Sequence, residues 1–295
     1  MWEYFKHAQS SSFSRTNIYF TPDSVWDKNP WAEIKNSKVE VWNPSSADIL
    51  FLAGMDWLAL SEQQRIFPPA PVINLIQHVR HADKKCPLYE FLKYPATRIC
   101  VSQEVADAIN ATGQVNGSVL VSPNGIDHSI FPERIKSPEK DIPLLIVGLK
   151  EPEMAKQLSD SLLQKNIKSL VITKHLHRYD FLSLLNRANT VVFLPNYKEG
   201  FYLPALEAMY FKALVICPDC IGNRTFCIND VTCMLPSYTI QALVSCVEKS
   251  FSFSLEKRHN LIEKAYQYAL HSSIEKEREY FVSVLDGLFK GVNKP

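Results

Sequence analysis

Two glutamates, Glu199 and Glu207, lie eight positions apart in the segment EGFYLPALEAM. The segment follows the apolar run TVVFLP, passes through a glycine and enters an expected helix at Pro204, in the first turn that proline favours. Such a strand–glycine–helix junction presents unbonded backbone N–H groups and the positive end of the helix dipole, which together bind phosphate. A carboxylate in the first turns of that helix can accept two hydroxyl hydrogen bonds from a ribose. The pattern therefore predicts a nucleotide site.

A second group of polar side chains follows the apolar run Val72–Ile76. In open α/β sheets, ligand groups gather beyond the carboxyl ends of the strands. We therefore expect His78, and as second choice His81, to lie close to the reacting group. Arg80 is a candidate for holding an acceptor carboxylate or phosphate. A histidine at this place can equally cap the strand, so both interpretations stay open.

Asp56 and Trp57 follow the apolar run Ile49–Ala53 and would share that edge of the sheet. A carboxylate beside an indole suits sugar binding, with hydroxyls on the carboxylate and an apolar sugar face on the ring. The alternative is a helix N-cap aspartate beside a core tryptophan. Both residues are therefore candidates for the acceptor side only.

Signals for metal and cofactor chemistry are weak. Cys217 and Cys220 form a Cys-x-x-Cys pair, but Cys227 and Cys233 do not have the spacing of a second pair, as structural zinc requires. No Gly-x-Gly-x-x-Gly or Walker-type loop is present, which speaks against dehydrogenases and P-loop kinases. We expect no metal site and no cofactor.

The elements that must position these residues form two alternating series of apolar runs and helical stretches, the pattern of parallel sheets covered by helices. The expected strands are 49–53, 72–76, 98–102 and 119–122 in the first series, and 144–147, 169–173, 190–194 and 214–217 in the second. The expected helices are 88–94, 104–112, 153–165, 180–187, 204–211, 239–250, 255–270 and 274–289. Residues 1–48 show only weak periodicity.

The stretch Pro132–Pro143 separates the two series and is rich in proline and charge, which predicts a linker. The expected organisation is one α/β domain at 1–135 and a second α/β domain at 136–255. Residues 256–295 would be two amphipathic helices that cross back to the first domain, because that domain needs additional apolar cover.

The glutamate segment resembles the signature of the glycosyl transferases group 1 family, whose two glutamates flank a Gly-Phe-Gly-Leu-Pro core. Two further stretches resemble other parts of the family pattern. SPNGIDHSIF at 122–131 matches the part where the first domain passes to the second, and LVICPDCIGNR at 214–224 matches the strand and glycine-containing loop after the glutamate helix. The resemblance covers roughly residues 97–250. It implies an α/β fold of the GT-B type, with two Rossmann-like domains whose parallel sheets face each other across a cleft. Residues 1–135 would form the acceptor-side domain, and residues 136–255 the domain that binds the nucleotide sugar. The resemblance also implies transfer of a sugar with retention of anomeric configuration and without an essential metal.

Two departures from the family pattern affect the donor site. Tyr202 replaces the second glycine, and the family's Arg and Lys near Gly148 are replaced by Leu149 and Met154. Lys150 is the candidate that replaces their charge, as a mobile point cation. The complete set of donor-binding candidates is Lys150, Arg178 in the base-lining loop 176–179, Gly200, Phe201, Tyr202, Leu203, Glu207 and Arg224. The catalytic candidates are Glu199, His78 and His81.

The resulting hypothesis is a hexosyltransferase of polysaccharide or glycan biosynthesis, with a nucleotide-sugar donor and a saccharide or glycan acceptor. Two alternatives remain: a catalytically degenerate subunit that binds a partner, and a nucleotide-sugar epimerase on the same fold. The formal net charge of +1 gives no field that would attract nucleic acid. Short apolar runs predict no transmembrane segment, although peripheral membrane contact stays open. Seven scattered cysteines indicate reduced thiols in the cytoplasm.

Overall fold

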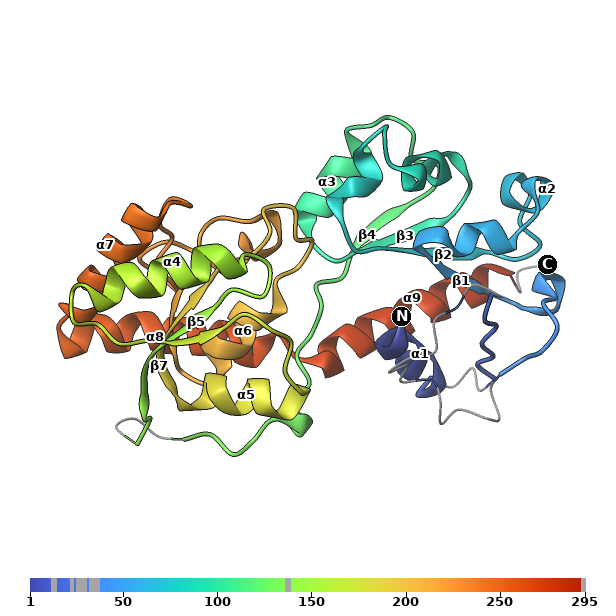
Figure 1. Ribbon diagram of the computed structural model, residues 1–295. Helices are drawn as coiled ribbons and strands as arrows, with labels where there is room; N and C mark the ends of the chain where they lie inside the picture. Colours follow the sequence, from blue (N-terminus) through green and yellow to red (C-terminus); the bar gives the residue numbers. More distant parts are fainter. Residues whose placement is uncertain (12–14, 22–23, 25–30, 32–37, 136–138, 293–295) are drawn as a thin grey trace. The chain divides into compact units, whose positions relative to one another are not determined.

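The computed structural model describes residues 1–11, 15–21, 24, 31, 38–135 and 139–292. The chain divides into two compact units. The first comprises Met1–Pro123 and Glu275–Pro295, and the second comprises Asn124–Ile274. Within the described residues, each unit is built on one parallel four-stranded sheet (Figure 1), so the predicted α/β class is confirmed.

The sheet of the first unit contains β1 (Leu50–Ala53), β2 (Val72–Ile76), β3 (Thr97–Cys100) and β4 (Val119–Val121), side by side in that order. All of its strand pairs are parallel. Every residue of β2 is buried, as expected for a strand inside a parallel sheet that is covered on both faces. The connections contain η2 (Pro44–Ser46), η3 (Gly54–Ala59), α2 (Glu62–Ile66), η4 (Val79–Ala82), η5 (Pro87–Lys93) and α3 (Gln103–Asn110).

The expected helix at 88–94 is the 3-10 helix η5, and its end is held by a buried arginine. Arg98 on β3 is fully buried and donates five hydrogen bonds to backbone carbonyls, three of them at the end of η5 on Phe91, Leu92 and Tyr94. Burial lowers the pKa of its guanidinium to about 10. One side chain thus binds several of the carbonyl oxygens at the end of a short helix, where intrahelical hydrogen bonds run out.

The last helix of the chain belongs to the first unit. In α9 (Ile274–Val292), the Phe281 ring packs edge-on against Tyr4 of α1 (Trp2–Gln9), with ring centroids 5.0 Å apart, and against Phe51 of β1 at 5.7 Å. The preceding helix, α8 (Leu255–His271), lies in the second unit instead. Only one of the two C-terminal helices therefore covers the first sheet.

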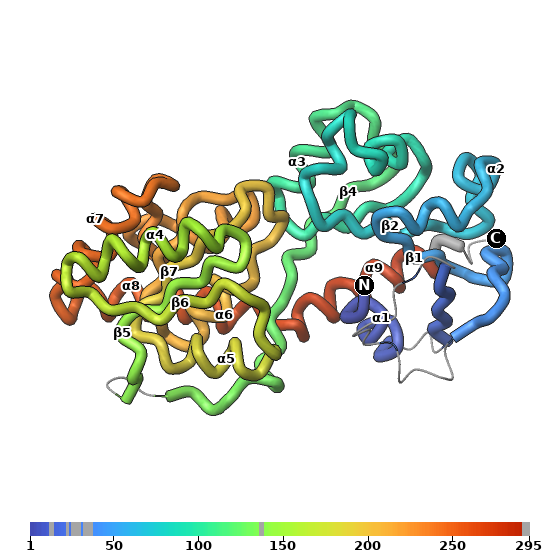
Figure 2. The backbone as a smooth tube through the Cα atoms, in the orientation of Figure 1, coloured from blue at the N-terminus to red at the C-terminus, as the bar shows by residue number. Residues whose placement is uncertain are grey.

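The sheet of the second unit contains β5 (Ile142–Val147), β6 (Leu170–Ile172), β7 (Ala188–Phe193) and β8 (Leu214–Ile216), in the spatial order β6-β5-β7-β8. Its helices are α4 (Pro152–Leu163), α5 (Arg178–Arg187), α6 (Leu203–Tyr210), α7 (Ile240–Phe251) and α8, with the short η6 (His128–Ile130) and η7 (Ile221–Asn223). As Figure 2 traces, the chain runs from β5 through α4 to β6 and returns through α5 to β7 on the other side of β5. The strand order therefore reverses between β5 and β7.

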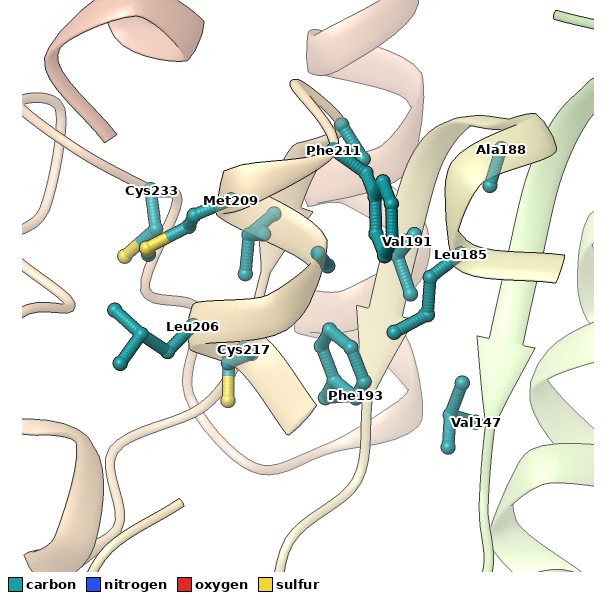
Figure 3. Packing of buried hydrophobic residues seen from close by; sticks show 14 of the residues in the cluster. Val147, Leu185, Ala188, Val191, Phe193, Leu206, Met209, Phe211, Cys217 and Cys233 are labelled. Atoms are coloured by element: carbon teal, nitrogen blue, oxygen red, sulfur yellow. The ribbon is translucent and has the colours of Figure 1, made fainter. Parts of the chain in front are cut away.

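Alternate residues of each central strand face opposite layers of helices. Leu144 and Ile146 pack in one cluster with α4 and α7, whereas Leu145 and Val147 pack in another with α5 and α6. Figure 3 shows the second layer, where Phe211, which follows α6, lies beside Val191 of β7. Because both faces are covered, the apolar runs of these strands are nearly continuous, which is why the sequence pattern located them to within two residues.

The boundary between the units differs from the one expected at residue 135, because the chain after Pro123 already packs on the second unit. Ile126 pairs with the α8–α9 junction: its amide donates to the Ser272 carbonyl over 2.9 Å, and its carbonyl accepts from the Ile274 amide over 3.1 Å. The motif SPNGIDHSIF thus continues from the end of β4 onto the second unit.

The expected linker is also partly built into the second unit. Lys140 is buried, and its ammonium donates to the carbonyls of Ala188 and Phe211, which end α5 and α6, over 2.8 and 2.7 Å. Burial, with a smaller effect of Arg258, lowers the pKa of Lys140 to about 7. Residues 136–138 of this stretch lie outside the described residues. Throughout the described chain, every helix is too short or too polar to span a bilayer.

Candidate functional site

The reversal of strand order marks one edge of the second sheet. In doubly wound sheets, ligands bind beyond the carboxyl ends of the strands at the point where the order reverses, here between β5 and β7. The chain leaves β5 through Gly148 to Lys150, and it leaves β7 through Pro195 to Glu199. The two predicted residues Lys150 and Glu199 therefore flank the switch point.

Tight packing brings Lys150 to this place. A Cβ atom on Gly148 would lie 2.3 Å from the Cβ of Ala155 in α4, so only glycine lets the strand turn this closely under the helix. The Lys150 Nζ lies 3.9 Å from Oε1 of Glu199, with 51% of the lysine side chain and 24% of the glutamate side chain exposed. A contact this long between exposed groups is weak, so both side chains can rearrange around a ligand.

The loop that carries Glu199 is held by the loop that follows β8. The Tyr202 amide donates to the Gly222 carbonyl over 2.8 Å. A Cβ on Gly222 would lie 2.6 Å from the Phe201 nitrogen and 2.9 Å from the Glu199 carbonyl oxygen. Gly222 is therefore required by the close approach of the two backbones. Among the described residues, the amides of Gly200 and Phe201 donate no hydrogen bond, so they can serve a phosphate.

Tyr202 serves the core rather than the ligand. Its amide is already bonded to Gly222, and its ring is buried against Phe193, with centroids 5.7 Å apart. Burial raises the pKa of its phenol well above the usual range. Its φ of −98° is one that any residue adopts, so the glycine usual in the family pattern is not needed here. The prediction that Tyr202 binds the donor is therefore wrong. The neighbouring Leu203 is the first residue of α6.

Glu207 lies in α6, but its carboxylate is not open to solvent. Both oxygens accept hydrogen bonds from the Arg178 guanidinium, from Nη1 to Oε2 over 2.9 Å and from Nη2 to Oε1 over 2.5 Å. Only 1% of the Glu207 side chain is exposed, against 46% of Arg178. The structure therefore brings together two predicted donor residues as a bidentate ion pair, the strongest geometry for this pairing.

Arg224 is also paired within the second unit. Its Nε and Nη2 donate to the two carboxylate oxygens of Asp219 over 2.9 and 2.7 Å, and Nη2 also donates to the Tyr197 hydroxyl over 3.2 Å. These hydrogen bonds raise the pKa of the Arg224 guanidinium. The predicted cation Arg224 is thus present near the glutamate loop, but its Nε and Nη2 already donate hydrogen bonds to Asp219.

In the first unit, the polar residues after β2 belong mostly to local structure. His78 is the N-cap of η4, and its Nδ1 accepts the Arg80 amide over 3.1 Å. The neutral His78 ring then carries its proton on Nε2. His81 is only 5% exposed, and burial, reinforced by the charge of Arg80, lowers its pKa to about 4. A buried, neutral His81 is badly placed to meet a substrate, whereas Arg80 is exposed.

Burial and local hydrogen bonding contradict the predicted acceptor-side role of Asp56 and Trp57, which follow β1. Trp57 is fully buried among Phe91 and Tyr94, so its indole offers no face to a sugar. Asp56 accepts the amide of Ala53 over 2.9 Å and closes the first turn of η3. Of the two interpretations of this pair, the capping aspartate beside a core tryptophan describes the structure.

The cysteine cluster shows no metal-binding geometry. Cys217, Cys220, Cys227 and Cys233 are buried free thiols, and burial raises the pKa of Cys220. Within the described chain, no three histidine, cysteine, aspartate or glutamate residues are arranged to hold a metal ion.

Two contributors to this edge were not predicted from the sequence. Tyr197 and Asp219, which hold Arg224, lie in the loops after β7 and β8. The sequence has a signal for Asp219, since this residue follows a predicted strand just as Glu199 does, although it lies within the Cys-x-x-Cys pair. The Tyr197 contact depends on how the two loops meet, for which the sequence has no local signal.

Comparisons with known proteins match this description. The family model described as Glycosyl transferases group 1 matches residues 131–268. Sucrose-phosphate synthase from Thermosynechococcus elongatus superposes with a TM-score of 0.66 at 14% identity, over 83% of this chain and 75% of that one. HepE from Anabaena in complex with UDP-glucose gives 0.67 at 13% identity, over 83% and 80%. The pneumococcal O-GlcNAc transferase GtfA in complex with UDP and GlcNAc gives 0.58 at 14% identity, over 83% and 57%. No curated protein sequence matches the chain.

The matched segment contains the whole switch-point edge, from the strand before Lys150 to the helix after Arg224. The similar structures have the two-sheet α/β architecture seen here. Residues 131–268 thus match the glycosyl transferases group 1 family, and the chain has the α/β fold of the glycosyltransferase structures to which it is similar.

Proposed function

We propose that this chain transfers a hexose from a nucleotide-diphosphate sugar to a saccharide or glycan acceptor. One observation carries the proposal: the Lys150–Glu199 contact and the Arg178–Glu207 pair are made by segments that follow strands β5, β6 and β7, in a domain that matches the family model. HepE and the pneumococcal O-GlcNAc transferase were both solved with UDP, which makes UDP the first nucleotide to test.

The donor site is proposed on the second unit. Lys150 and the amides of Gly200 and Phe201 bind the diphosphate, because a mobile cation and two unbonded amides lie at one edge of the sheet. Glu207 binds the ribose hydroxyls, and the loop 176–179 lines the base. Glu199, a quarter exposed beside Lys150, positions the hydroxyls of the transferred sugar.

In the reaction, the bond between the sugar C1 and the phosphate oxygen breaks, and its electron pair leaves with the nucleoside diphosphate. The acceptor oxygen bonds to C1, and its proton passes to the departing phosphate. Lys150 and the loop amides stabilise the negative charge that develops on that phosphate, which is the largest contribution that fixed dipoles and charges make to catalysis. His78 of the first unit is kept as a proposed catalytic residue, with Nε2 as its hydrogen-bond donor. The family resemblance supports retention at C1 without an essential metal, and also a role in glycan assembly.

A second function is favoured by the state of the cations. Arg224 is neutralised by Asp219, and the family's Arg and Lys are absent, so Lys150 is the one predicted phosphate ligand without a short ion pair among the described residues. A subunit that has lost transfer activity and supports a partner would show this pattern. It would bind UDP weakly or not at all, which separates it from the enzyme.

Calorimetry with UDP tests the proposal. Glu207→Ala is expected to lose about 2 kcal/mol of affinity, or about thirtyfold, because hydroxyl hydrogen bonds to a charged group are lost. The matched control is Glu263→Ala, which removes a carboxylate paired with Lys212 elsewhere in the same unit. It should leave the affinity unchanged.

Circular dichroism verifies that each variant is folded. Equal affinity of the folded Glu207→Ala variant and the wild type would remove Glu207 from the site. Release of UDP from UDP-sugars in the presence of oligosaccharide acceptors then separates the enzyme from the inactive subunit.

A further inference from the structure

Arg178 stands between solvent and the carboxylate that the proposed donor needs. The Glu207 side chain is 1% exposed, and both of its oxygens accept hydrogen bonds from the Arg178 guanidinium. Arg178 itself is nearly half exposed. A ligand that arrives from solvent therefore meets the guanidinium before it meets the carboxylate.

The position of Arg178 in its helix is unfavourable without a partner. It is the first residue of α5, and the N-cap residue His177 makes no side-chain capping bond. A cation in the first turn is repelled by the positive end of the helix dipole. The pair with Glu207 offsets this repulsion, and it also compensates the burial of the carboxylate. Arg178 and Glu207 thus stabilise each other. A ligand that binds the Glu207 carboxylate must therefore compete with Arg178.

We propose that Arg178 is a latch on Glu207, which the ribose hydroxyls of the donor displace when the nucleotide binds. The inference rests on the proposed function, since it assumes that Glu207 binds ribose. A bidentate guanidinium and a pair of vicinal hydroxyls present two donors at similar spacing, so they compete for the same two oxygens. Part of the binding energy of the ribose is therefore spent on opening the ion pair.

The opposite arrangement is a shared carboxylate, in which Arg178 stays in place and aligns Glu207 for the ribose. A carboxylate has four lone-pair positions, so both partners can bind it when its outer positions are open. At 1% exposure, those positions are covered in this structure. The latch and the shared carboxylate predict couplings of opposite sign between Arg178 and the ribose hydroxyls.

A thermodynamic cycle measures that coupling. The affinities of UDP and of 2′,3′-dideoxy-UDP are determined by calorimetry for the wild type and for Arg178→Met. The affinity for UDP divided by the affinity for 2′,3′-dideoxy-UDP isolates the contribution of the hydroxyls. With a latch, the ratio rises at least tenfold in Arg178→Met, because the hydroxyls no longer compete. A ratio that falls would establish the shared carboxylate and overturn the latch. An unchanged ratio would overturn the latch as well, without establishing the shared carboxylate.

Arg178→Lys provides a second variant in case the loss of the pair weakens the contact between α5 and α6. Lysine keeps the charge but loses the bidentate fork, so the ratio should lie between those of the wild type and Arg178→Met. Lys165→Met is the matched control, since it removes a half-exposed cation paired with Glu248 in the same unit. Its ratio should equal that of the wild type.

The outcomes separate the two proposals. If the wild type binds UDP and Glu207→Ala weakens it, a falling or constant ratio overturns the latch alone. If neither the wild type nor the folded variants bind UDP, the proposed donor site fails, and the latch fails with it.

Discussion

The carboxyl edges of the two sheets carry similar residues but use them differently. At the edge of the second sheet, charged side chains pair with each other across loops, as in Lys150–Glu199 and Arg178–Glu207. At the edge of the first sheet, polar side chains after the strands bond to their own neighbouring backbone, as His78 does with Arg80. The second edge keeps its charge available to a ligand, whereas the first uses most of its polar groups to end strands and begin short helices.

This difference shows that the position of a residue after a strand does not by itself determine the role of that residue. A histidine or aspartate after a strand is well placed for a ligand and equally well placed to cap the next turn. Asp56 and His78 both cap. The segment from Glu199 to Glu207 says more, because its glycine, its proline and its two glutamates specify a loop, a helix start and two carboxylates at once.

The largest expected effect is on the free energy of unfolding of the first unit in acid, and it depends on His81. Its folded-state pKa is about 4, below the ordinary 6.5, because burial and the nearby positive groups of Arg80, His78 and Arg98 disfavour the charged ring. Between these two pH values, the unfolded chain binds a proton that the folded chain does not. The free energy of unfolding should therefore be unaffected above pH 6.5 and should fall by about 3 kcal/mol as the pH drops to 4.

Urea unfolding followed by tryptophan fluorescence measures this effect, since all five tryptophans lie at or before residue 57 and report on the first unit. His81→Leu should remove this part of the acid sensitivity, whereas the exposed His259→Leu of the second unit should not. If His81→Leu and the wild type lose the same stability in acid, His81 is accessible in the folded state. It would then return as a substrate-facing candidate.

The second effect concerns the contact that supports the glutamate loop. Gly222→Ala places a methyl group within 3 Å of backbone atoms of Phe201 and Glu199, and backbone yields less readily than a side-chain end. We expect a loss of about 2–3 kcal/mol of stability, the upper part of the range for overpacking, together with weaker UDP binding. Gly287→Ala in α9 is the control, because nothing lies within 4 Å of its Cβ position. Full UDP affinity in Gly222→Ala would show that the loop does not hold the nucleotide.

Sequence patterns located the framework of both units well, and the reasons are local. Buried parallel strands appear as apolar runs, and helices start at prolines and capping residues, as α6 does at Leu203–Pro204. The glutamate segment gave the strand–loop–helix junction for the same reason. The class of fold and the position of the donor edge were therefore predictable from short windows of sequence.

Contacts between distant segments were not predictable in this way. The partners Arg178 and Glu207 are 29 residues apart, and nothing near either one indicates the other. The proline-rich stretch looked like a linker because its composition is polar, yet Lys140 is buried on the carbonyl ends of α5 and α6. Trp57 looked available because it follows a strand, but η3 turns it into the core. Pairing and burial depend on tertiary packing, which a local pattern does not contain.

The third effect tests whether the second edge binds phosphate at all. Lys150→Ala should weaken UDP binding by about 2 kcal/mol, or about thirtyfold, and leave uridine binding unchanged, because the lysine is proposed to contact only the diphosphate. Lys165→Ala, beyond the C-terminal end of α4, is the matched control. Equal losses for UDP and uridine would mean that Lys150 supports the site in another way, and no loss would mean that the phosphates lie elsewhere.

The smallest structural change gives the most direct test of the comparison. His78→Asn replaces the imidazole by a residue that also caps helices, so its oxygen can accept the Arg80 amide in place of Nδ1. The stability of the first unit should then change by less than about 0.5 kcal/mol, and UDP affinity should be unaffected because the nucleotide is proposed to bind the second unit. Sugar transfer should nevertheless slow at least tenfold, since the shorter asparagine side chain has no donor at the position of Nε2 and its amide does not exchange protons as imidazole does. An unchanged rate of transfer in this variant would mean that His78, like Trp57, has only a structural role in the first unit. The catalytic groups would then have to lie at the carboxyl edge of the second sheet.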